Sequence, residues 1–327
     1  MGYGMDWSKQ TVLVTGGTGS FGQKFVEVML KDYRPKKLII FSRDEHKQSE
    51  MRERFPGMEL RFFLGDVRDL NRLLRAFAGV DVVIHAAALK QIPTLEYNPF
   101  EAVKTNILGT QNVVEAAVER KACKVVMIST DKAVNPISLY GATKLCAEKI
   151  SVDANAYAGL DGTKISCVRY GNVVGSRGSV VPLFLDQRKS GTLTITDKRM
   201  TRFWMTIEQG VRFVIRCAEL MHGGEIFVPK IPSMRITDLA QALAPACKLK
   251  VTGVRPGEKL HEVLLTEDEA RRAKAFDDLF VIEPEYMFRD EQRWKDGKQL
   301  ADGFRYTSDE NDAWLTPETL RKMANAE

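Results

Sequence analysis

Thr11-Val12-Leu13-Val14-Thr15-Gly16-Gly17-Thr18-Gly19-Ser20-Phe21-Gly22 is the most informative stretch of this sequence. The apolar run at 11–15 predicts a buried strand, and the pattern at 23–31 predicts a helix. Glycines between a strand and a helix allow a tight turn and let a pyrophosphate reach the backbone amides at the helix N-terminus. A tight turn without a ligand is the alternative. Because the motif follows the first strand of a βαβ pattern, it predicts a dinucleotide site.

The alternation of strand and helix continues through the first half of the sequence. Short apolar runs at 37–41, 60–64, 80–85 and 124–129 predict strands, and helical patterns separate them. Apolar strands joined by helices indicate a parallel sheet that is covered on both faces. We therefore predict an α/β fold, a Rossmann-like doubly wound parallel sheet with a smaller α/β substrate lobe at the C-terminal side.

The alternation weakens in the second half, where short segments with glycine and proline interrupt it. Helical patterns recur there, so we expect the smaller lobe to be interleaved with the last strands of the sheet. We place a dinucleotide-binding domain at residues 1–172, with approximately 205–232 returning to it. The substrate lobe is expected at 173–204 and 233–327.

Composition and charge exclude several classes of function. The 327 residues are 44% hydrophobic and 28% charged, as in an ordinary soluble protein, and the net charge of +5 suits an anionic ligand. No basic run indicates nucleic-acid binding, and no apolar run approaches the ~18 residues that span a bilayer. The odd number of cysteines, without a Cys-x-x-Cys pair, favours reduced thiols over disulfides or a zinc site. With no signal peptide visible, we expect a cytoplasmic protein without a metal.

The end of the second predicted strand should lie beside the adenosine ribose, about 20 residues past the glycines. There the sequence has Ser42, Arg43 and Asp44, with Lys47 close behind. A hydroxyl and a guanidinium suit a ribose 2′-phosphate, which favours NADP as the cofactor. In the alternative, Asp44 takes the ribose, Arg43 is a solvated loop charge, and the cofactor is NAD.

The third and fourth predicted strands end in Asp66-Val67 and in His85-Ala86-Ala87-Ala88. The carboxylate of Asp66 can accept a hydrogen bond from the adenine amino group. The small side chains after His85 let the backbone approach the ribose and nicotinamide of the cofactor. For His85 itself we prefer a hydrogen-bonded core histidine to a functional role.

Tyr140-Gly141-Ala142-Thr143-Lys144 places a phenol and an ammonium four residues apart, and therefore on one face of a helix. A neighbouring cation and the nicotinamide charge would lower the pKa of the tyrosine from its ordinary ~10 toward the operating pH. An isolated match of this kind often marks only the surface of a helix. After a Rossmann half, it resembles the Tyr/Lys pair of the short-chain dehydrogenases, in which the lysine also holds the nicotinamide ribose. The residues expected to contact the dinucleotide are Gly16, Thr18, Gly19, Ser20, Phe21, Gly22, Ser42, Arg43, Asp44, Lys47, Asp66, Val67, Ala86, Ala87, Ala88, Lys90, Tyr140 and Lys144.

The strand that precedes this helix ends in Ser129-Thr130-Asp131-Lys132. Simple dehydrogenases and sugar epimerases have small residues after the Ser/Thr, so Asp131 and Lys132 need a task that hydride transfer does not supply. The segment is similar to the Thr-Asp-Glu of dTDP-glucose 4,6-dehydratases, and it resembles the Thr-Asp-Lys of UDP-N-acetylglucosamine 4,6-dehydratases. The alternative is that Asp131 and Lys132 form a solvated loop pair.

The resemblance to this dehydratase family extends over nearly the whole chain. The stretches that carry it are 89–93, 96–99, 104–106, 129–144, 170–182, 200–204 and 255–262. With Tyr at position 140 the sequence resembles the inverting enzymes that open pseudaminic acid synthesis. Some related dehydratases, including retaining ones, carry Met at the corresponding position. Gln91 departs from the pattern, which has His after the lysine. The resemblance implies UDP-N-acetylglucosamine as substrate and a homo-oligomer such as a hexamer.

The resemblance also implies a role for each catalytic residue. Tyr140 removes the proton of the sugar 4-hydroxyl, Lys144 lowers the pKa of Tyr140, and Thr130 orients the 4-oxygen. Lys132, if neutral, removes the C5 proton, and Asp131, if held protonated by burial, protonates the departing 6-hydroxyl. Return of a proton to the opposite face of C5 would invert that centre. NADP is regenerated in each cycle and is expected to stay bound.

A further set of residues is expected at the nucleotide sugar. Asn172 and the loop that begins at Arg177 are candidates for the pyrophosphate and uracil, and Glu258 for a ribose hydroxyl. Arg202 and Arg255 are candidates for the diphosphate, because a planar guanidinium pairs well with phosphate oxygens. For each arginine a structural salt bridge is the alternative. The full set is Lys90, Asn172, Arg177, Val180, Arg202, Arg255 and Glu258.

Three other functions stay open on the sequence alone. They are a UDP-sugar 4-epimerase, a C5-retaining 4,6-dehydratase and a non-catalytic NADP-binding sensor. Epimerisation needs no base at C5, so Asp131 and Lys132 argue against the first. A sensor has no reason to keep Thr130, Tyr140 and Lys144 together.

Overall fold

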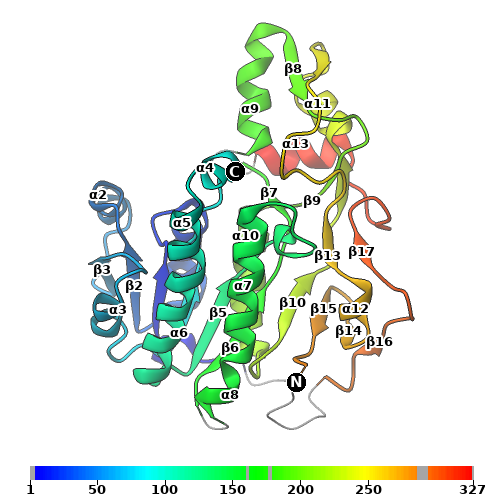
Figure 1. Ribbon diagram of the computed structural model, residues 1–327. Helices are drawn as coiled ribbons and strands as arrows, with labels where there is room; N and C mark the ends of the chain where they lie inside the picture. Colours follow the sequence, from blue (N-terminus) through cyan, green and yellow to red (C-terminus); the bar gives the residue numbers. More distant parts are fainter. Residues whose placement is uncertain (1–3, 160–161, 176–178, 286–293, 326–327) are drawn as a thin grey trace.

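The computed structural model describes residues 4–159, 162–175, 179–285 and 294–325, and its centre is a ten-stranded sheet with helices on both sides (Figure 1). The parallel part of the sheet has the strand order β3-β2-β1-β4-β5-β6-β10. These strands are β1 (Thr11–Thr15), β2 (Lys37–Ser42), β3 (Leu60–Leu64), β4 (Val82–His85), β5 (Lys124–Ile128), β6 (Lys164–Val168) and β10 (Ile226–Pro229). The order is that of a doubly wound Rossmann sheet, so the predicted fold class is confirmed.

Two layers of helices cover this sheet. On one face α1 (Ser20–Val28) packs against α10 (Ile207–Leu220). On the other face α3 (Leu70–Ala76) packs against α6 (Gly109–Glu119), which in turn lies beside α7 (Leu139–Asp153). The long crossover helices are what allow neighbouring strands to run parallel.

The hydrophobic core is divided by the sheet in the way the alternation of strand side chains requires. In β1, Val12 and Val14 belong to the same buried cluster as Phe25 of α1. Leu13, which points the other way, belongs to the cluster that contains Leu73 of α3. Both faces of the strand are therefore buried, which is why its sequence is apolar without a break.

Short helices and turns connect these elements. They are α2 (Glu45–Arg54), α4 (Ile92–Tyr97), α5 (Pro99–Ala102), α8 (Asn155–Ala158), the 3-10 turns η1 (Trp7–Lys9), η4 (Asp131–Ala133) and η5 (Arg188–Ser190), and the π-helical segments η2 (Met29–Tyr33) and η3 (Val103–Leu108). The expected helix at 23–31 is thus α1 followed by η2, and it starts three residues earlier than predicted.

A smaller lobe lies at the top of Figure 1, beyond the carboxyl ends of the parallel strands. Its helices α9, α11 and α13 and its short sheets pack around Trp204, Phe184 and Leu239. The elements are β7 (Asn172–Val173), α9 (Val180–Gln187), β8 (Thr192–Ile195), β9 (Thr201–Met205), β11 (Ser233–Arg235), α11 (Ile236–Leu243), β12 (Lys248–Val251) and α13 (Pro317–Asn325). A substrate held against the large sheet would lie between the two parts of the molecule.

The C-terminal third differs in one respect from the predicted domain division. Strands β15 (Leu279–Ile282), β14 (Ala273–Ala275) and β16 (Lys298–Gln299) extend the large sheet beyond β10, all by antiparallel pairing. They were expected in the smaller lobe, within 233–327. Antiparallel neighbours need no crossover helix, so they leave no βαβ signal in the sequence.

Three further short elements of this third lie beside the large sheet, at the right of Figure 1. Strands β13 (Val263–Leu265) and β17 (Tyr306–Thr307) pair with each other, and α12 (Glu267–Ala270) follows β13. Among the described residues, none of the helices is both long and apolar enough to cross a bilayer.

Candidate active site

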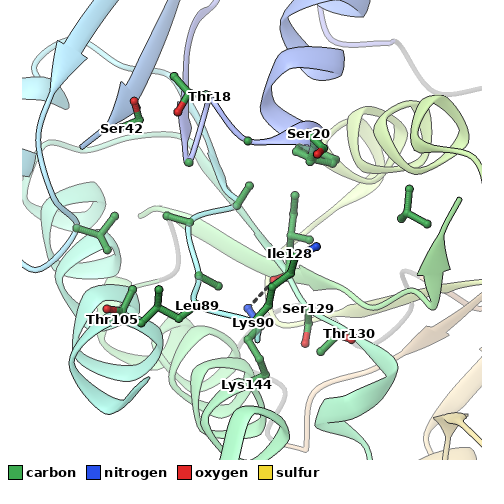
Figure 2. Close-up of a pocket in the computed structure, with 18 of the residues that line it drawn as sticks. Thr18, Ser20, Ser42, Leu89, Lys90, Thr105, Ile128, Ser129, Thr130 and Lys144 are labelled. Carbon is green, nitrogen blue, oxygen red and sulfur yellow. Dashed lines mark hydrogen bonds between the residues drawn. The ribbon is translucent and has the colours of Figure 1, made fainter. Parts of the chain in front are cut away.

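A cavity of about 690 Å³ opens at the carboxyl ends of the parallel strands, where a doubly wound sheet binds its ligands. Its wall is formed by the loop after β1, by the ends of β2 to β5 and by the start of α7 (Figure 2). The residues predicted at the dinucleotide that lie in this wall are Gly16, Thr18, Gly19, Ser20, Phe21, Ser42, Arg43, Asp44, Lys47, Asp66, Val67, Ala86, Ala87, Ala88, Lys90, Tyr140 and Lys144. Gly22 lies behind it, packed so closely on the loop that an added Cβ would be 2.4 Å from Gly17 Cα.

The loop after β1 has the shape of a phosphate cradle. Gly16 has a φ of +66°, and a Cβ at this position would lie 2.9 Å from the Ala87 backbone. Gly19 precedes α1 without a side-chain cap, so the described residues offer no side-chain acceptor to the first amides of that helix. A pyrophosphate satisfies such amides and is attracted by the helix dipole. The loop therefore fits a dinucleotide.

At the end of β2, Asp44 is engaged by its own helix. Its carboxylate accepts a hydrogen bond from Lys47 N at 3.0 Å, and Lys47 Nζ lies 2.6 Å from the second oxygen. These contacts with Lys47 lower the pKa of Asp44. Arg43 is more than half exposed at the cavity wall, with Nη1 3.8 Å from Asp66 Oδ2. Arg43 thus has a long ion pair with Asp66 and reaches the cavity wall, while the Asp44 carboxylate is paired with Lys47.

Asp66 at the end of β3 is also paired. Arg68 donates to it from its backbone N at 3.0 Å and from Nη2 at 2.8 Å. Burial alone would raise the pKa of Asp66, but the contacts with Arg68 outweigh burial and lower it. The carboxylate is therefore ionised and acts only as an acceptor toward any ligand.

His85 is the hydrogen-bonded core histidine expected from the sequence. Thr15 Oγ1 accepts a hydrogen bond from Ala87 N and donates its own hydrogen to His85 Nδ1 at 2.8 Å. Thr110 Oγ1 donates to Asn106 O, so it must accept from His85 Nε2 at 3.0 Å. Burial lowers the pKa of His85 to about 3, which keeps the ring neutral. This chain of bonds fixes the backbone at Ala87, close to the glycine loop.

The sequence did not indicate a role for Asn106, but its side chain connects the segment after β4 with helix α7. Its amide oxygen accepts from Leu89 N at 2.8 Å, and its Nδ2 donates to Leu89 O at 2.9 Å. Nδ2 also donates to Thr143 Oγ1 on the Tyr140 helix at 3.0 Å. Lys90, next to this clamp, lines the cavity, and partial burial together with the charge of Lys132 lowers its pKa.

Tyr140 and Lys144 lie one turn apart on α7, whose first turn is capped by Ser138 Oγ. Lys144 Nζ donates to Ile128 O at 2.7 Å, the dashed line in Figure 2. Burial lowers the pKa of Lys144 to about 8, although Glu148 acts against this. Burial raises the pKa of Tyr140 to about 12, and Lys132 is the cation that opposes this. The cation that acts on the pKa of Tyr140 here is thus Lys132, whereas the expected one was Lys144.

Asp131 and Lys132 form an ion pair, not two solvated loop charges. Lys132 Nζ lies 2.9 Å from Asp131 Oδ1, and Thr130 Oγ1 donates to the same oxygen at 2.9 Å. The Asp131 side chain is fully buried, and burial raises its pKa despite the charge of Lys132. Burial would lower the pKa of Lys132, but the charges of Asp131 and Glu262 outweigh burial and raise it. The neutral Lys132 required by the expected mechanism is thus not the resting form.

Glu262 is a member of this cluster that the sequence did not single out. Its carboxylate is buried and lies 3.5 Å from Lys132 Nζ, 3.4 Å from Arg202 Nε and 3.7 Å from Lys259 Nζ. Lys259 also donates to the backbone carbonyl of Asp131 at 3.3 Å. Glu262 ends the stretch 255–262 that carries the family resemblance, but no spacing rule links it to residues so far away in the sequence.

A second network of buried side chains contacts α7, the helix that carries Tyr140 and Lys144. Glu148, one turn after Lys144, binds Arg169 through two bonds of 2.6 and 3.1 Å and accepts a hydrogen bond from Ser129 Oγ. Arg169 also contacts Glu269 of α12 at 3.0 and 3.1 Å. This network thereby holds together helix α7, the end of β5 and α12.

The residues predicted at the sugar nucleotide are spread more widely. Asn172 lines the cavity, and its buried Oδ1 has no hydrogen-bond partner among the described residues. The same holds for Ser179 Oγ, beside Val180 at the start of α9. Val180 itself packs against the core of the smaller lobe. Arg177 lies outside the described residues. The two unpartnered oxygens fit a polar ligand at this end of the cavity.

For Arg202 the structure favours the structural alternative. Its guanidinium donates to Thr201 O at 2.7 Å, to Leu260 O at 3.0 Å and to Lys259 O at 2.9 Å, and it pairs with Glu262. These contacts engage most of its donors and favour the structural salt bridge, while diphosphate binding by Arg202 stays a prediction.

Arg255 and Glu258 lie on a loop that packs against α4 and α7. A Cβ at Gly257, between them, would be 3.0 Å from Ser138 Cβ and 3.2 Å from Ile92 Cγ2. Arg255 is exposed, and neither residue lines the cavity. Their contact with a nucleotide stays a prediction. Among the described residues, no group of three or more His, Cys, Asp or Glu side chains is arranged to hold a metal ion.

Comparison with known proteins agrees with this geometry. A family model described as "Polysaccharide biosynthesis protein" matches residues 12–284. A Campylobacter jejuni protein named UDP-N-acetylglucosamine 4,6-dehydratase (inverting) is 50% identical over 98% of each chain. A Rickettsia canadensis protein named UDP-glucose 4-epimerase is 43% identical over 84% of this chain and 82% of its own. The solved structure of Pen from Bacillus thuringiensis superposes with a TM-score of 0.90 at 38% identity, covering 98% of this chain and 99% of that one.

Proposed function

Because this chain belongs to the polysaccharide biosynthesis protein family, we propose that it is a UDP-N-acetylglucosamine 4,6-dehydratase that inverts C5. The product is UDP-2-acetamido-2,6-dideoxy-β-L-arabino-hex-4-ulose, which opens pseudaminic acid synthesis. The single observation that carries the proposal is the ion pair of the buried Asp131 with Lys132, which lines the cavity beside Tyr140. Elimination of water needs an acid and a base within reach of one sugar ring, and oxidation alone does not.

We propose NADP as the cofactor. The glycine loop would hold its pyrophosphate, Ser42 and Arg43 its 2′-phosphate, and Lys144 its nicotinamide ribose. Ser42 Oγ accepts from Gln48 Nε2 at 3.0 Å, which leaves its own hydrogen for a phosphate oxygen. NAD is the alternative, but Asp44 is occupied by Lys47 and would first have to leave it. When bound, the nicotinamide would accept a hydride from C4 of the sugar and return it to C6 of the sugar.

Tyr140 is the base for the first step in this proposal. As phenolate it takes the proton of the sugar 4-hydroxyl, while Thr130 orients the oxygen. Its pKa of about 12 has to fall, and the positive charge of Lys132 and the hydrogen bond with Thr130 act in that direction. The ketone that forms at C4 then acidifies the proton on C5.

The Asp131–Lys132 pair performs the elimination. Transfer of one proton from Lys132 Nζ to Asp131 Oδ1 across 2.9 Å turns the ion pair into an amine and a carboxylic acid. The amine takes the C5 proton, and the acid protonates the 6-oxygen, which leaves as water. Lys132 is then protonated and Asp131 ionised again, so the pair is restored within one elimination. The C5=C6 double bond left by the elimination would then take up the hydride at C6 and a proton from solvent on the opposite face of C5, which completes the inversion, and Tyr140 would release its proton to solvent.

A UDP-sugar 4-epimerase is the second candidate, since one relative bears that activity in its name. The two functions are separated by the mass of the product. The purified protein, given UDP-N-acetylglucosamine without added cofactor, is expected to yield a product lighter by one water in mass spectrometry. A product of unchanged mass that co-elutes with UDP-N-acetylgalactosamine would contradict the proposal and identify an epimerase.

We further propose a homo-oligomer in the cytoplasm. Three large apolar side chains are exposed close together in the sequence, Tyr97 at 87%, Phe100 at 76% and Leu108 at 45%, on α4, α5 and η3. Exposed apolar clusters of this kind often lie in subunit interfaces. Light scattering coupled to gel filtration measures the assembly, and a monomer at micromolar concentration would contradict this part of the proposal.

A further inference from the structure

Glu262 is a buried ionisable residue at this site, and no step of the proposed reaction uses it. Only 2% of its surface is exposed, and it is absent from the cavity wall, where Lys132 stands. Its backbone is fixed by two bonds to Ser308, one from Glu262 N at 2.9 Å and one to Glu262 O at 2.8 Å. The carboxylate therefore has a set position behind Lys132, on the side away from a ligand.

The carboxylate of Glu262 faces three cations. Oε1 faces Lys132 Nζ at 3.5 Å and Arg202 Nε at 3.4 Å, and Oε2 faces Lys259 Nζ at 3.7 Å. Oε2 has no hydrogen-bond partner among the described residues. A carboxylate needed only for packing would be expected to use both oxygens in short hydrogen bonds. The long contacts indicate a charge that acts at a distance on several groups.

We propose that Glu262 is a positioning residue that sets the protonation of the Asp131–Lys132 pair through its negative charge next to Lys132. This inference rests on the proposed dehydratase function and adds a group to it. Glu262 touches neither the cavity nor the reacting atoms, so it acts only through the pair. Its charge keeps the shared proton on the pair, and it keeps Lys132 a cation between turnovers.

The direction of the effect follows from the charges that face the pair. A negative charge raises the proton affinity of both Asp131 and Lys132, and a positive charge lowers it. Glu262 therefore raises both, and Lys259 on its other side lowers both. Among the described residues, the titratable and charged groups that act on or are affected by the pair are Tyr140, Lys90, Arg202, Lys259 and Glu262.

The reactive form of the pair carries one proton in total, so the rate should fall on both sides of an optimum pH. At low pH a second proton binds and removes the base, and at high pH the shared proton is lost. Removing the charge of Glu262 moves both limbs of this profile to lower pH. Removing the charge of Lys259 moves both limbs to higher pH.

The test compares the pH profiles of kcat for dehydration of UDP-N-acetylglucosamine. Glu262→Gln is expected to shift both limbs down by on the order of one pH unit, and Lys259→Gln is expected to shift them up. Glu262→Asp keeps the charge and should restore most of the wild-type profile. The matched control is Glu267→Gln, which replaces an exposed carboxylate on α12 and should leave the profile unchanged. Thermal melting identifies any variant that does not fold.

A folded Glu262→Gln variant with the wild-type profile would overturn the inference, as would shifts of the same sign in Glu262→Gln and Lys259→Gln. If Glu262→Gln does not fold, Lys259→Gln decides: an upward shift supports the inference, and an unchanged profile overturns it. Failure of the proposed function looks different, because then the wild-type protein releases no dehydrated product at any pH.

Discussion

Lys132 Nζ lies 2.9 Å from Asp131 Oδ1, and the aspartate of this pair is fully buried. Two ionisable groups in such contact titrate as one unit and share a proton. The relationship explains how a lysine whose pKa is raised can still act as a base, since its proton has an acceptor within hydrogen-bond reach. The neighbouring Thr130 donates to the same oxygen, Asp131 Oδ1, at 2.9 Å.

The first prediction concerns the acid of the pair. Asp131→Asn removes both the acceptor of the Lys132 proton and the donor to the 6-oxygen, so kcat for loss of water should fall by about 10²–10⁴-fold. Initial rates of product formation, followed by mass spectrometry, measure this. Asp186→Asn, an exposed aspartate on α9, should behave as wild type. A loss in Asp131→Asn of only a few fold would show that another group protonates the leaving oxygen.

The second prediction separates oxidation at C4 from elimination. Lys132→Met removes the base for C5 but leaves Tyr140, Thr130 and Lys144, so oxidation should proceed and then stop. Near-ultraviolet absorbance of reduced nicotinamide should therefore appear on mixing with substrate and persist. Because Lys132 is also a cation near Tyr140, its loss should raise the pKa of Tyr140 and move the rise of oxidation rate with pH to higher pH. Continued release of dehydrated product would contradict the assignment.

The third prediction tests the choice of cofactor. Arg43→Met removes the guanidinium expected at the 2′-phosphate, so affinity for NADP should fall about tenfold or more while affinity for NAD stays the same. Cofactor-free protein titrated with each dinucleotide gives both values. Lys36→Met, an exposed lysine that precedes β2, is the control. If NAD binds the wild-type protein more tightly than NADP, the proposed cofactor is wrong, whatever the variant does.

The fourth prediction concerns stability. Arg169→Met leaves Glu148 and Glu269 as buried carboxylates without their partner, which should cost about 3–5 kcal/mol in the free energy of unfolding. Urea denaturation measures the loss, and Arg271→Met, on an exposed arginine, should cost far less. An equally stable Arg169→Met variant would contradict the role of this network.

The same network gives a pH dependence with a definite sign. Burial alone would raise the pKa of Glu269, but Arg169 outweighs it and holds the folded pKa below the ordinary value of 4.5. A lowered folded pKa contributes stability above the unfolded pKa, and that stability is lost as pH falls through the folded pKa. The wild-type protein should therefore lose this contribution below about pH 4.5, and Arg169→Met should lose less over the same range.

Much of the fold follows from local patterns in the sequence. The strand at Thr11–Thr15 and the glycines after it mark a βα turn by residue type alone, and each later βα unit repeats the signal. Strands β14, β15 and β16, at one end of the large sheet, were expected in the smaller lobe, because short antiparallel strands carry no crossover helix. Their assignment depends on the pairing of β15 with β10, of β14 with β15 and of β16 with β14, which is a tertiary property.

The candidate site was predictable only where its residues follow a motif. Tyr140 and Lys144 share a helix face by spacing, and Asp131 and Lys132 stand out at the end of a strand. Glu262, Glu148 and Asn106 follow no such rule, because their roles arise from contacts between distant elements. For Arg202 the sequence suggests a phosphate ligand, but only the structure shows that backbone carbonyls already use its donors.

The most direct test of the central claim is the reaction of the wild-type protein with UDP-N-acetylglucosamine in heavy water, followed by proton NMR without added cofactor. The account predicts a new C6 methyl signal, deuterium at C5 and couplings of the L-arabino configuration, because the C5 proton leaves to Lys132 and returns from solvent on the opposite face. A methyl signal with the original C5 configuration would keep dehydration and contradict inversion. Formation of UDP-N-acetylgalactosamine with no methyl signal would contradict the role of the Asp131–Lys132 pair altogether.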